Sequence, residues 1–172
     1  MAGNYWKPEY NHKRLEVRRQ QRIQKHMKKM QRFSTINKMA LSYTAGLVDG
    51  EGCILININK AKRSYTLQVR IGMATVQAIK WLHKTFRGSL GMCNAKNHTS
   101  MHIWVISSAE AEGFLKCLLP YLKVKKEEAK VALAFRKHLN STRRFGKILP
   151  IEVIAKREAY RIKLQEMKRN EK

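Results

Sequence analysis

The sequence predicts an α+β domain in which helices cover one face of a four-stranded antiparallel sheet. Two consecutive segments alternate apolar and polar residues, as is typical of half-buried strands, and two further strand segments follow later in the chain. Segments with apolar residues at helical spacing precede and follow each pair. The expected order is therefore helix, strand, strand, helix, strand, strand, helix and helix, between a basic N-terminal arm and a C-terminal helix.

The composition is that of a globular domain with a large excess of positive charge. Of 172 residues, 44% are hydrophobic, while 36 Lys and Arg oppose 12 Asp and Glu. The net charge of +24 favours a polyanionic partner, with nucleic acid the first candidate and an acidic membrane surface the second. No apolar run approaches the roughly 20 residues of a membrane-spanning helix, and the first residues lack the apolar core of a signal peptide. We therefore expect an intracellular protein.

The N-terminal segment is a strongly basic arm. We divide the chain into an arm over residues 1–37, a core over 38–140, and a C-terminal loop and helix over 141–172. Residues 7–32 contain ten Lys and Arg but only two acids, and helix is favoured from about Leu15. A narrow apolar stripe is formed by Ile23, Met27 and Met30. The arm is either a solvated helix lying on the domain or a segment that follows DNA phosphates, and the scarcity of acids favours the second.

Local signals place the remaining elements. Ser34, Thr35 or Asn37 can cap a first helix that runs to Val48. The later elements come in this order: strands Cys53–Asn59 and Tyr65–Ala74, a helix from Thr75 to Phe86, strands from Gly88 to about Asn94 and over Ser100–Ile106, and helices over Ser107–Leu119, Lys125–Leu139 and Pro150–Arg169. Thr75 is expected to cap its helix, and Ser107 with Glu110 forms a capping-box pattern.

The segment Leu41–Gly52, LSYTAGLVDGEG, ends a helix in two acids set among glycines. Ser42, Gly46 and Gly50 lie four residues apart, so another backbone can approach this helical face closely. Glu51 falls at the helix C-terminus, where the macrodipole is already negative. A carboxylate there is electrostatically unfavourable unless a cation lies beside it, which makes Glu51 a candidate functional residue.

The first strand pair presents polar and basic residues on the face away from the core. They are Asn57, Asn59, Lys60, Lys62, Arg63, Gln68 and Arg70. Asn and Gln match adenine edges, Arg matches guanine, and an antiparallel ribbon fits the DNA major groove. An exposed sheet face is often polar without a function, but the net charge of +24 favours DNA readout. RNA binding would need aromatic stacking platforms, for which only Trp104 or His102 on the fourth strand is a candidate.

Residues Tyr43–Gly52, followed at once by an alternating strand, resemble the motif of the LAGLIDADG homing endonucleases. The segment Leu119–Lys126 is similar to the LxPxLxxKxxQ segment of that family, and the likeness covers about Lys38–Leu139. The motif occurs once, and single-copy members of the family act as homodimers. The resemblance therefore implies two motif helices packed along a two-fold axis through their small-residue faces, with both sheets forming one saddle on double-stranded DNA.

The resemblance also implies residue roles and a reaction. Two Glu51 carboxylates and the Gly50 carbonyls would meet at the scissile phosphates and hold Mg²⁺. Lys125 matches the lysine that supports phosphate or solvent, while Asp49 would be mainly structural. The implied activity is that of an intron- or intein-encoded homing endonuclease. It would cut both strands of a long, roughly palindromic site and leave short 3′ overhangs.

Two positions depart from the family pattern. Where well-studied single-motif members carry Gln and Arg, this sequence has Thr75 and Ile79. An alternative function is a binding module on the same fold, either an intron RNA maturase or a regulator without cleavage. The presence of both Glu51 and Lys125 favours cleavage. A basic ribosome-associated or membrane-surface protein would leave the two acids of the glycine motif unexplained.

Overall fold

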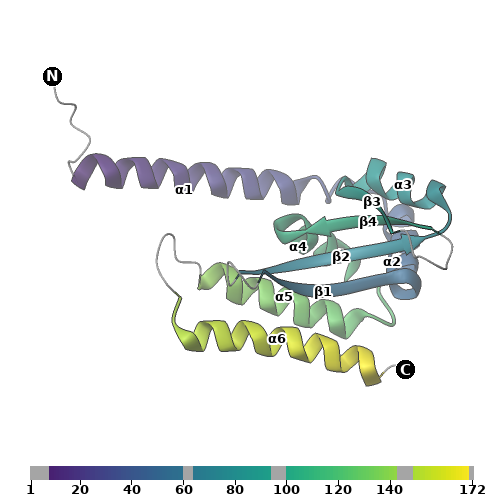
Figure 1. Cartoon of the computed structure of the whole chain (residues 1–172). Helices are drawn as coiled ribbons and strands as arrows, with labels where there is room; N and C mark the ends of the chain where they lie inside the picture. The colour runs from purple at the N-terminus through teal and green to yellow at the C-terminus, as the bar shows by residue number, and fades with distance from the viewer. Residues whose placement is uncertain (1–7, 60–63, 94–99, 143–148, 171–172) are drawn as a thin grey trace.

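The computed structural model describes residues 8–59, 64–93, 100–142 and 149–170 (Figure 1). The helices in these ranges are α1 (Pro8–Gln31), α2 (Lys38–Glu51), α3 (Val76–Phe86), α4 (Ser108–Leu118), α5 (Lys126–Ser141) and α6 (Ile151–Asn170). The strands are β1 (Gly52–Asn59), β2 (Ser64–Met73), β3 (Ser89–Cys93) and β4 (Met101–Ser107). None of these helices is long and apolar enough to cross a bilayer.

The strands form one antiparallel sheet in the order β1-β2-β4-β3. Ile54 of β1 lies opposite Val69 of β2, and Ile71 of β2 lies opposite Trp104 of β4. All four of these side chains are fully buried. The period-two pattern of the sequence therefore turns one face of the sheet toward the core, and the predicted α+β architecture is confirmed.

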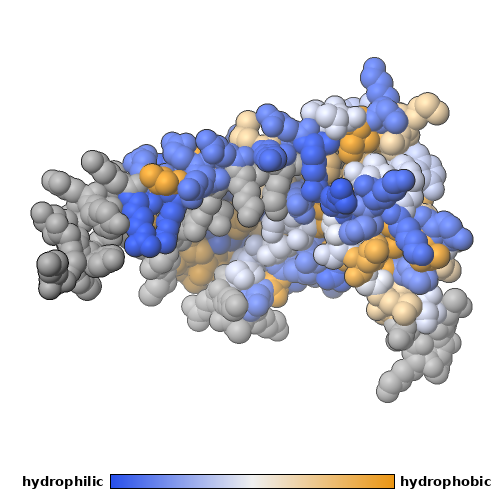
Figure 2. Space-filling view, turned by 90° about the horizontal axis from the view of Figure 1, so that it is seen from above, coloured by the Kyte–Doolittle hydropathy of each residue, from blue (hydrophilic) through white to orange (hydrophobic). Residues whose placement is uncertain are grey.

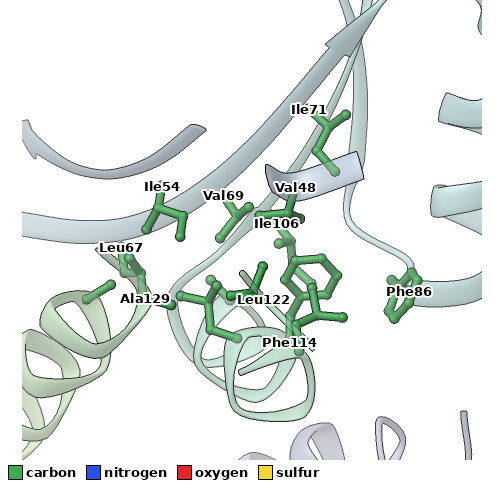
Figure 3. Packing of buried hydrophobic residues seen from close by; sticks show 14 of the residues in the cluster. Val48, Ile54, Leu67, Val69, Ile71, Phe86, Ile106, Phe114, Leu122 and Ala129 are labelled. Carbon is green, nitrogen blue, oxygen red and sulfur yellow. The ribbon is translucent and has the colours of Figure 1, made fainter. Parts of the chain in front are cut away.

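The core lies between this sheet face and the helices that cover it. Figure 3 shows buried residues of this core from α2, β1, β2, β4, α3, α4, the segment between α4 and α5, and α5. The Phe114 ring lies 5.1 Å from both the Phe86 and the Trp104 rings. Burying a side chain such as Phe or Ile stabilises a fold by roughly 1.5–3 kcal/mol. Trp104 belongs to this core and donates a hydrogen bond from Nε1 to the Arg87 carbonyl (2.5 Å), so it is not the base-stacking platform considered above.

Helix ends differ from the predictions in four places. Helix α1 begins at Pro8 rather than about Leu15, because proline is tolerated in a first helical turn. Helix α2 continues three residues beyond Val48, with Gly52 as its C-cap and Asn37 as its N-cap. Thr75 occupies the N-cap position of α3 but makes no capping hydrogen bond.

The predicted capping box of α4 does not form. The Ser107 side chain makes no capping hydrogen bond, and Ser108 has a positive φ of 56°, which turns the chain away from the usual entry into a helix. Glu110 instead accepts a hydrogen bond from Arg32 (Nη1–Oε1 3.4 Å). A contact between residues 78 positions apart therefore replaces the local one.

Helices α1 and α6 flank the sheet on opposite sides (Figure 1). Helix α6 packs against α5 and β1, as Leu164 lies in the core. Helix α1 contacts α4 and is followed by an anchor in which Arg32 Nη2 donates to the Phe86 carbonyl (2.7 Å). Ile23 and Met27 remain 47% and 54% exposed, so the predicted apolar stripe is not packed on the domain. The side chain of Met30 lies outside the described residues.

Candidate functional site

The C-terminal turn of α2 meets the segment that leads into α5. Lys125 Nζ donates a hydrogen bond to the Asp49 carbonyl oxygen (2.5 Å), and the backbone N–H groups of Lys123 and Lys125 donate to the Asp49 carboxylate (2.8 and 2.9 Å). An ammonium at a helix C-terminus satisfies an orphan carbonyl and opposes the negative end of the dipole. Lys125 is therefore the cation that the sequence required beside this helix end.

Asp49 links the end of α2 to the segment that leads into α5. Its carboxylate accepts two backbone hydrogen bonds at the entry to α5, a place where a helix dipole favours negative charge. Its carbonyl at the same time holds the Lys125 ammonium. The predicted structural part of the Asp49 role agrees with this geometry, since both oxygens of the carboxylate are engaged in backbone contacts.

Glu51 is the last residue of α2, and its side chain is exposed. The structure gives this carboxylate no hydrogen-bond partner among the described residues. The Gly50 carbonyl lies in the same last turn, where helix carbonyls lack intrahelical donors. The two oxygens form the hard donor set that Mg²⁺ prefers, whereas the described ranges contain no group of three or more His, Cys, Asp and Glu that could hold a metal ion.

One face of α2 is open and lined by small residues. Ser42, Gly46 and Gly50 are exposed, and a Cβ added at either glycine would meet nothing within 4 Å. Met39 and Tyr43 share this face and are 84% and 53% exposed. The same helix therefore presents an exposed face of small residues with Met39 and Tyr43 beside them, and the exposed Glu51 carboxylate at its end.

The open face of the sheet carries a hydrogen-bonded polar group. Gln68 Oε1 accepts hydrogen bonds from Asn57 Nδ2 (2.5 Å), Arg70 Nη2 (2.9 Å) and Arg70 Nε (3.2 Å). These three side chains come from neighbouring strands and constrain one another's rotamers. Asn59 is exposed at the end of β1. The predicted contacts Lys60, Lys62 and Arg63 lie outside the described residues.

The two positions that depart from the family pattern differ in burial. Ile79 is 2% exposed and belongs to the hydrophobic core, so it offers no polar group to the site. Thr75, Gln77 and Lys80 are exposed.

Lys168 is a residue near the site that sequence reasoning missed. Its Nζ donates a hydrogen bond to the Ile54 carbonyl at the start of β1, lies 3.1 Å from Cys53 Sγ and lies 3.7 Å from Glu128 Oε2. It thereby ties the end of α6 to the strand that follows Glu51. No local pattern distinguishes it from the other basic residues of α6, because its role depends on how α6 packs.

A second polar cluster joins α6 to the start of β2. Tyr65 donates a hydrogen bond from its hydroxyl to Glu158 Oε2 (2.9 Å), and Arg161 Nε donates to Glu158 Oε1 (2.9 Å). The hydrogen bond from Arg161 holds the pKa of Glu158 below its ordinary value. Burial, together with the bond to Glu158, raises the pKa of Tyr65. This cluster lies at the other end of β1 from Glu51 and is structural.

Comparison with known proteins agrees with this geometry. The family model described as LAGLIDADG endonuclease matches residues 44–138, more than half of the 172-residue chain. The DNA endonuclease I-CreI of Chlamydomonas reinhardtii is 27% identical over 113 residues, which cover 62% of this chain and 68% of that protein.

Solved structures show the same fold. The homing endonuclease I-CvuI, in complex with an I-CreI target, aligns with a TM-score of 0.61 at 22% identity, covering 76% of this chain and 82% of that one. The archaeal intron-encoded homing endonuclease I-Vdi141I, complexed with DNA, aligns with a TM-score of 0.61 at 12% identity, covering 75% and 84%. Helix α1 lies outside the matched family region.

Proposed function

Because this chain belongs to the LAGLIDADG endonuclease family, we propose that it is a site-specific DNA endonuclease that works as a homodimer with Mg²⁺. The observation that carries the proposal is the exposed Glu51 carboxylate at the end of α2, the helix whose Asp49 carbonyl binds Lys125 and whose small-residue face is open. These features supply an acid, a cation and a packing surface in one place.

The dimer follows from the shape of α2. Two copies packed through Ser42, Gly46 and Gly50 would bring their helix C-termini together, so both Glu51 carboxylates would lie near the two-fold axis. Each chain would contribute one Glu51 carboxylate, so two carboxylates would serve the two scissile phosphates. A two-fold protein reads a roughly palindromic site, with one half-site on each sheet.

The residues present fit a magnesium ion. The Glu51 carboxylate and Gly50 carbonyl of each copy would hold it together with phosphate oxygens, and the bound ion would neutralise charge at the phosphate and make a water more acidic. Lys125 would stabilise negative charge on the phosphate, since its ammonium is held at the end of α2 by the Asp49 carbonyl. Asp49 would keep Lys125 in position through its two backbone contacts.

The open sheet face would supply sequence preference. Gln68 and Arg70 are held by mutual hydrogen bonds before DNA arrives, so little rotamer freedom is lost when they meet base edges. The target would be found by selecting cleaved sites from a randomised DNA library with Mg²⁺. Binding without cleavage would then be measured with Ca²⁺ in its place.

Glu51→Gln tests the central assignment. We expect cleavage of the selected site to be lost while DNA affinity in Ca²⁺ changes by less than about threefold, because the amide keeps the shape but not the charge. Glu127→Gln, which removes another exposed acid, from α5, is the control and should cleave normally. Full cleavage by Glu51→Gln would refute the assignment.

A binding module on the same fold is the second candidate. It is favoured by the burial of Ile79 at a position where the family pattern is polar. Binding of a selected DNA or of a structured RNA by the wild-type chain, with no cleavage in Mg²⁺, Mn²⁺ or Ca²⁺, would establish this function instead.

A further inference from the structure

Helix α1 is the longest helix in the described ranges and carries eight Lys and Arg residues. It has 24 residues and so a length of about 36 Å. The domain holds it at its C-terminal end, where Arg32 bonds to Phe86 and Phe33 is buried against the Phe86 ring. Residues 14–21 are all exposed. Figure 2, which views the molecule from the side of α1, shows a mostly hydrophilic described surface along this helix.

The basic residues of α1 are not spread evenly around the helix. Five of the eight occur at successive spacings of four, four, three and four, which places them on one helical face. These sequence positions, named the basic face below, are Arg14, Arg18, Arg22, Lys25 and Lys29, of which the side chains of Arg14 and Arg18 are among the described residues and are exposed. By the same helical spacing, the exposed acid Glu16 falls on the opposite side of the helix. The basic face extends over about 22 Å of the helix axis.

The direction of α1 relates this face to the proposed dimer. In Figure 1 the N-terminal end of α1 lies far from α2 and beyond the end of the sheet at which β1 finishes. If α2 lies on the two-fold axis, α1 points toward the outer end of a half-site. Its length of about 36 Å is close to one turn of B-DNA, which advances about 34–36 Å.

We propose that α1 is an arm that binds the phosphate backbone of the DNA flanking the recognition site through its basic face. This inference rests on the proposed function, because the sheet must first place the chain on a duplex. Duplex DNA is the favoured partner, since it presents a regular row of negative charge to an extended row of positive charge. Contacts to phosphates carry no base information, so the arm adds affinity and not sequence preference.

The test compares two triple variants of the full chain with the same loss of charge. One replaces Arg14, Arg18 and Arg22 on the basic face with Gln. The control replaces Lys13, Arg19 and Lys28, which lie off that face, with Gln. Gln keeps helix propensity close to that of Lys and Arg, and circular dichroism checks that α1 remains helical.

Binding is measured in Ca²⁺ over a range of salt concentrations on two duplexes. One covers only the selected site and the other adds random flanking sequence on both sides. We expect the wild type to bind the longer duplex at least about tenfold more tightly. The basic-face variant should lose this gain in affinity. It should also reduce the magnitude of the slope of log K against log salt by about five, because three lost phosphate contacts in each of two subunits contribute roughly 0.9 each. The control should keep most of the gain.

Three results would overturn the proposal. They are equal losses in the two triple variants, no effect of flanking DNA on the wild type, or a basic-face variant that loses only binding to structured RNA. Cleavage of the short duplex separates the two levels of inference. If the wild type cleaves the short duplex and flanking DNA changes neither binding nor cleavage, only the proposed role of α1 is refuted. If the wild type cleaves neither duplex, the proposed endonuclease function is refuted.

Discussion

Replacing Gly46 separates folding of one chain from association of two. A Cβ at this position meets nothing within 4 Å in the isolated chain. Gly→Ala in a helix interior removes backbone freedom from the unfolded chain, so Gly46→Ala should stabilise the monomer by about 0.5–1 kcal/mol. In the proposed dimer the same atom would enter a close-packed seam.

A larger side chain at position 46 would overpack the interface between the two α2 helices. Inserting extra methylenes into a well-packed contact costs about 1–3 kcal/mol per site, and a two-fold interface contains the substituted site twice. Gly46→Leu should therefore weaken the dimer by about 2–6 kcal/mol, which is at least about a thirtyfold increase in Kd. Sedimentation velocity over a concentration series measures Kd, and urea unfolding below that Kd measures the monomer.

Two other glycines provide controls. Gly91 in β3 is also open, so Gly91→Leu should leave the dimer Kd unchanged. At Gly52 a Cβ would lie 2.5 Å from the Val48 carbonyl oxygen, so Gly52→Ala should destabilise the fold itself. Unchanged association of Gly46→Leu would show that this face of α2 is not the dimer seam.

Three further substitutions test the contacts around the site. Asp49→Ala removes two hydrogen bonds to a carboxylate and should lower the free energy of unfolding in urea by about 2–4 kcal/mol. A decrease below about 0.5 kcal/mol would contradict the structural role of Asp49. Lys168→Met removes the donor to the Ile54 carbonyl and should cost about 1–3 kcal/mol, with Lys168→Arg as the control that restores most of it. The pKa of Glu158 is lowered in the fold by Arg161, so its stabilisation is present above the ordinary value of 4.5 and is lost as pH falls below it. Glu158→Gln should therefore be less stable than the wild type at neutral pH, and thermal melts should show the difference shrinking as the pH falls below 4.5 and through the lowered pKa of Glu158.

Local patterns were sufficient for much of the fold and for part of the site. Alternation in β1 and β2 identified which face is buried, because the side-chain period of a strand is a property of the backbone alone. The spacing of Ser42, Gly46 and Gly50 identified the bare face of α2 for the same kind of reason. Glu51 stood out because the dipole of its own helix makes the position unfavourable.

Other features were decided only by tertiary packing. The bond from Lys125 to Asp49 joins residues 76 positions apart, and Lys168 reaches Ile54 across 114 positions. A tertiary contact also replaced a predicted local one, since Glu110 accepts a hydrogen bond from Arg32 and the capping box at the start of α4 does not form. The exposure of α1 also depends on tertiary packing, because the contacts of Arg32 and Phe33 with Phe86 determine its position on the domain.

The buried faces of β1 and β2, the small-residue face of α2 and the acid at the end of α2 could be predicted from the sequence, because each follows from a short pattern along one element. Three other features depend on tertiary packing: the bond of Lys125 to the C-terminal end of α2, the bond of Lys168 to β1, and the direction of α1 relative to the sheet. Those outcomes depend on the packing of elements distant in the chain, and no repeat within a single element encodes it.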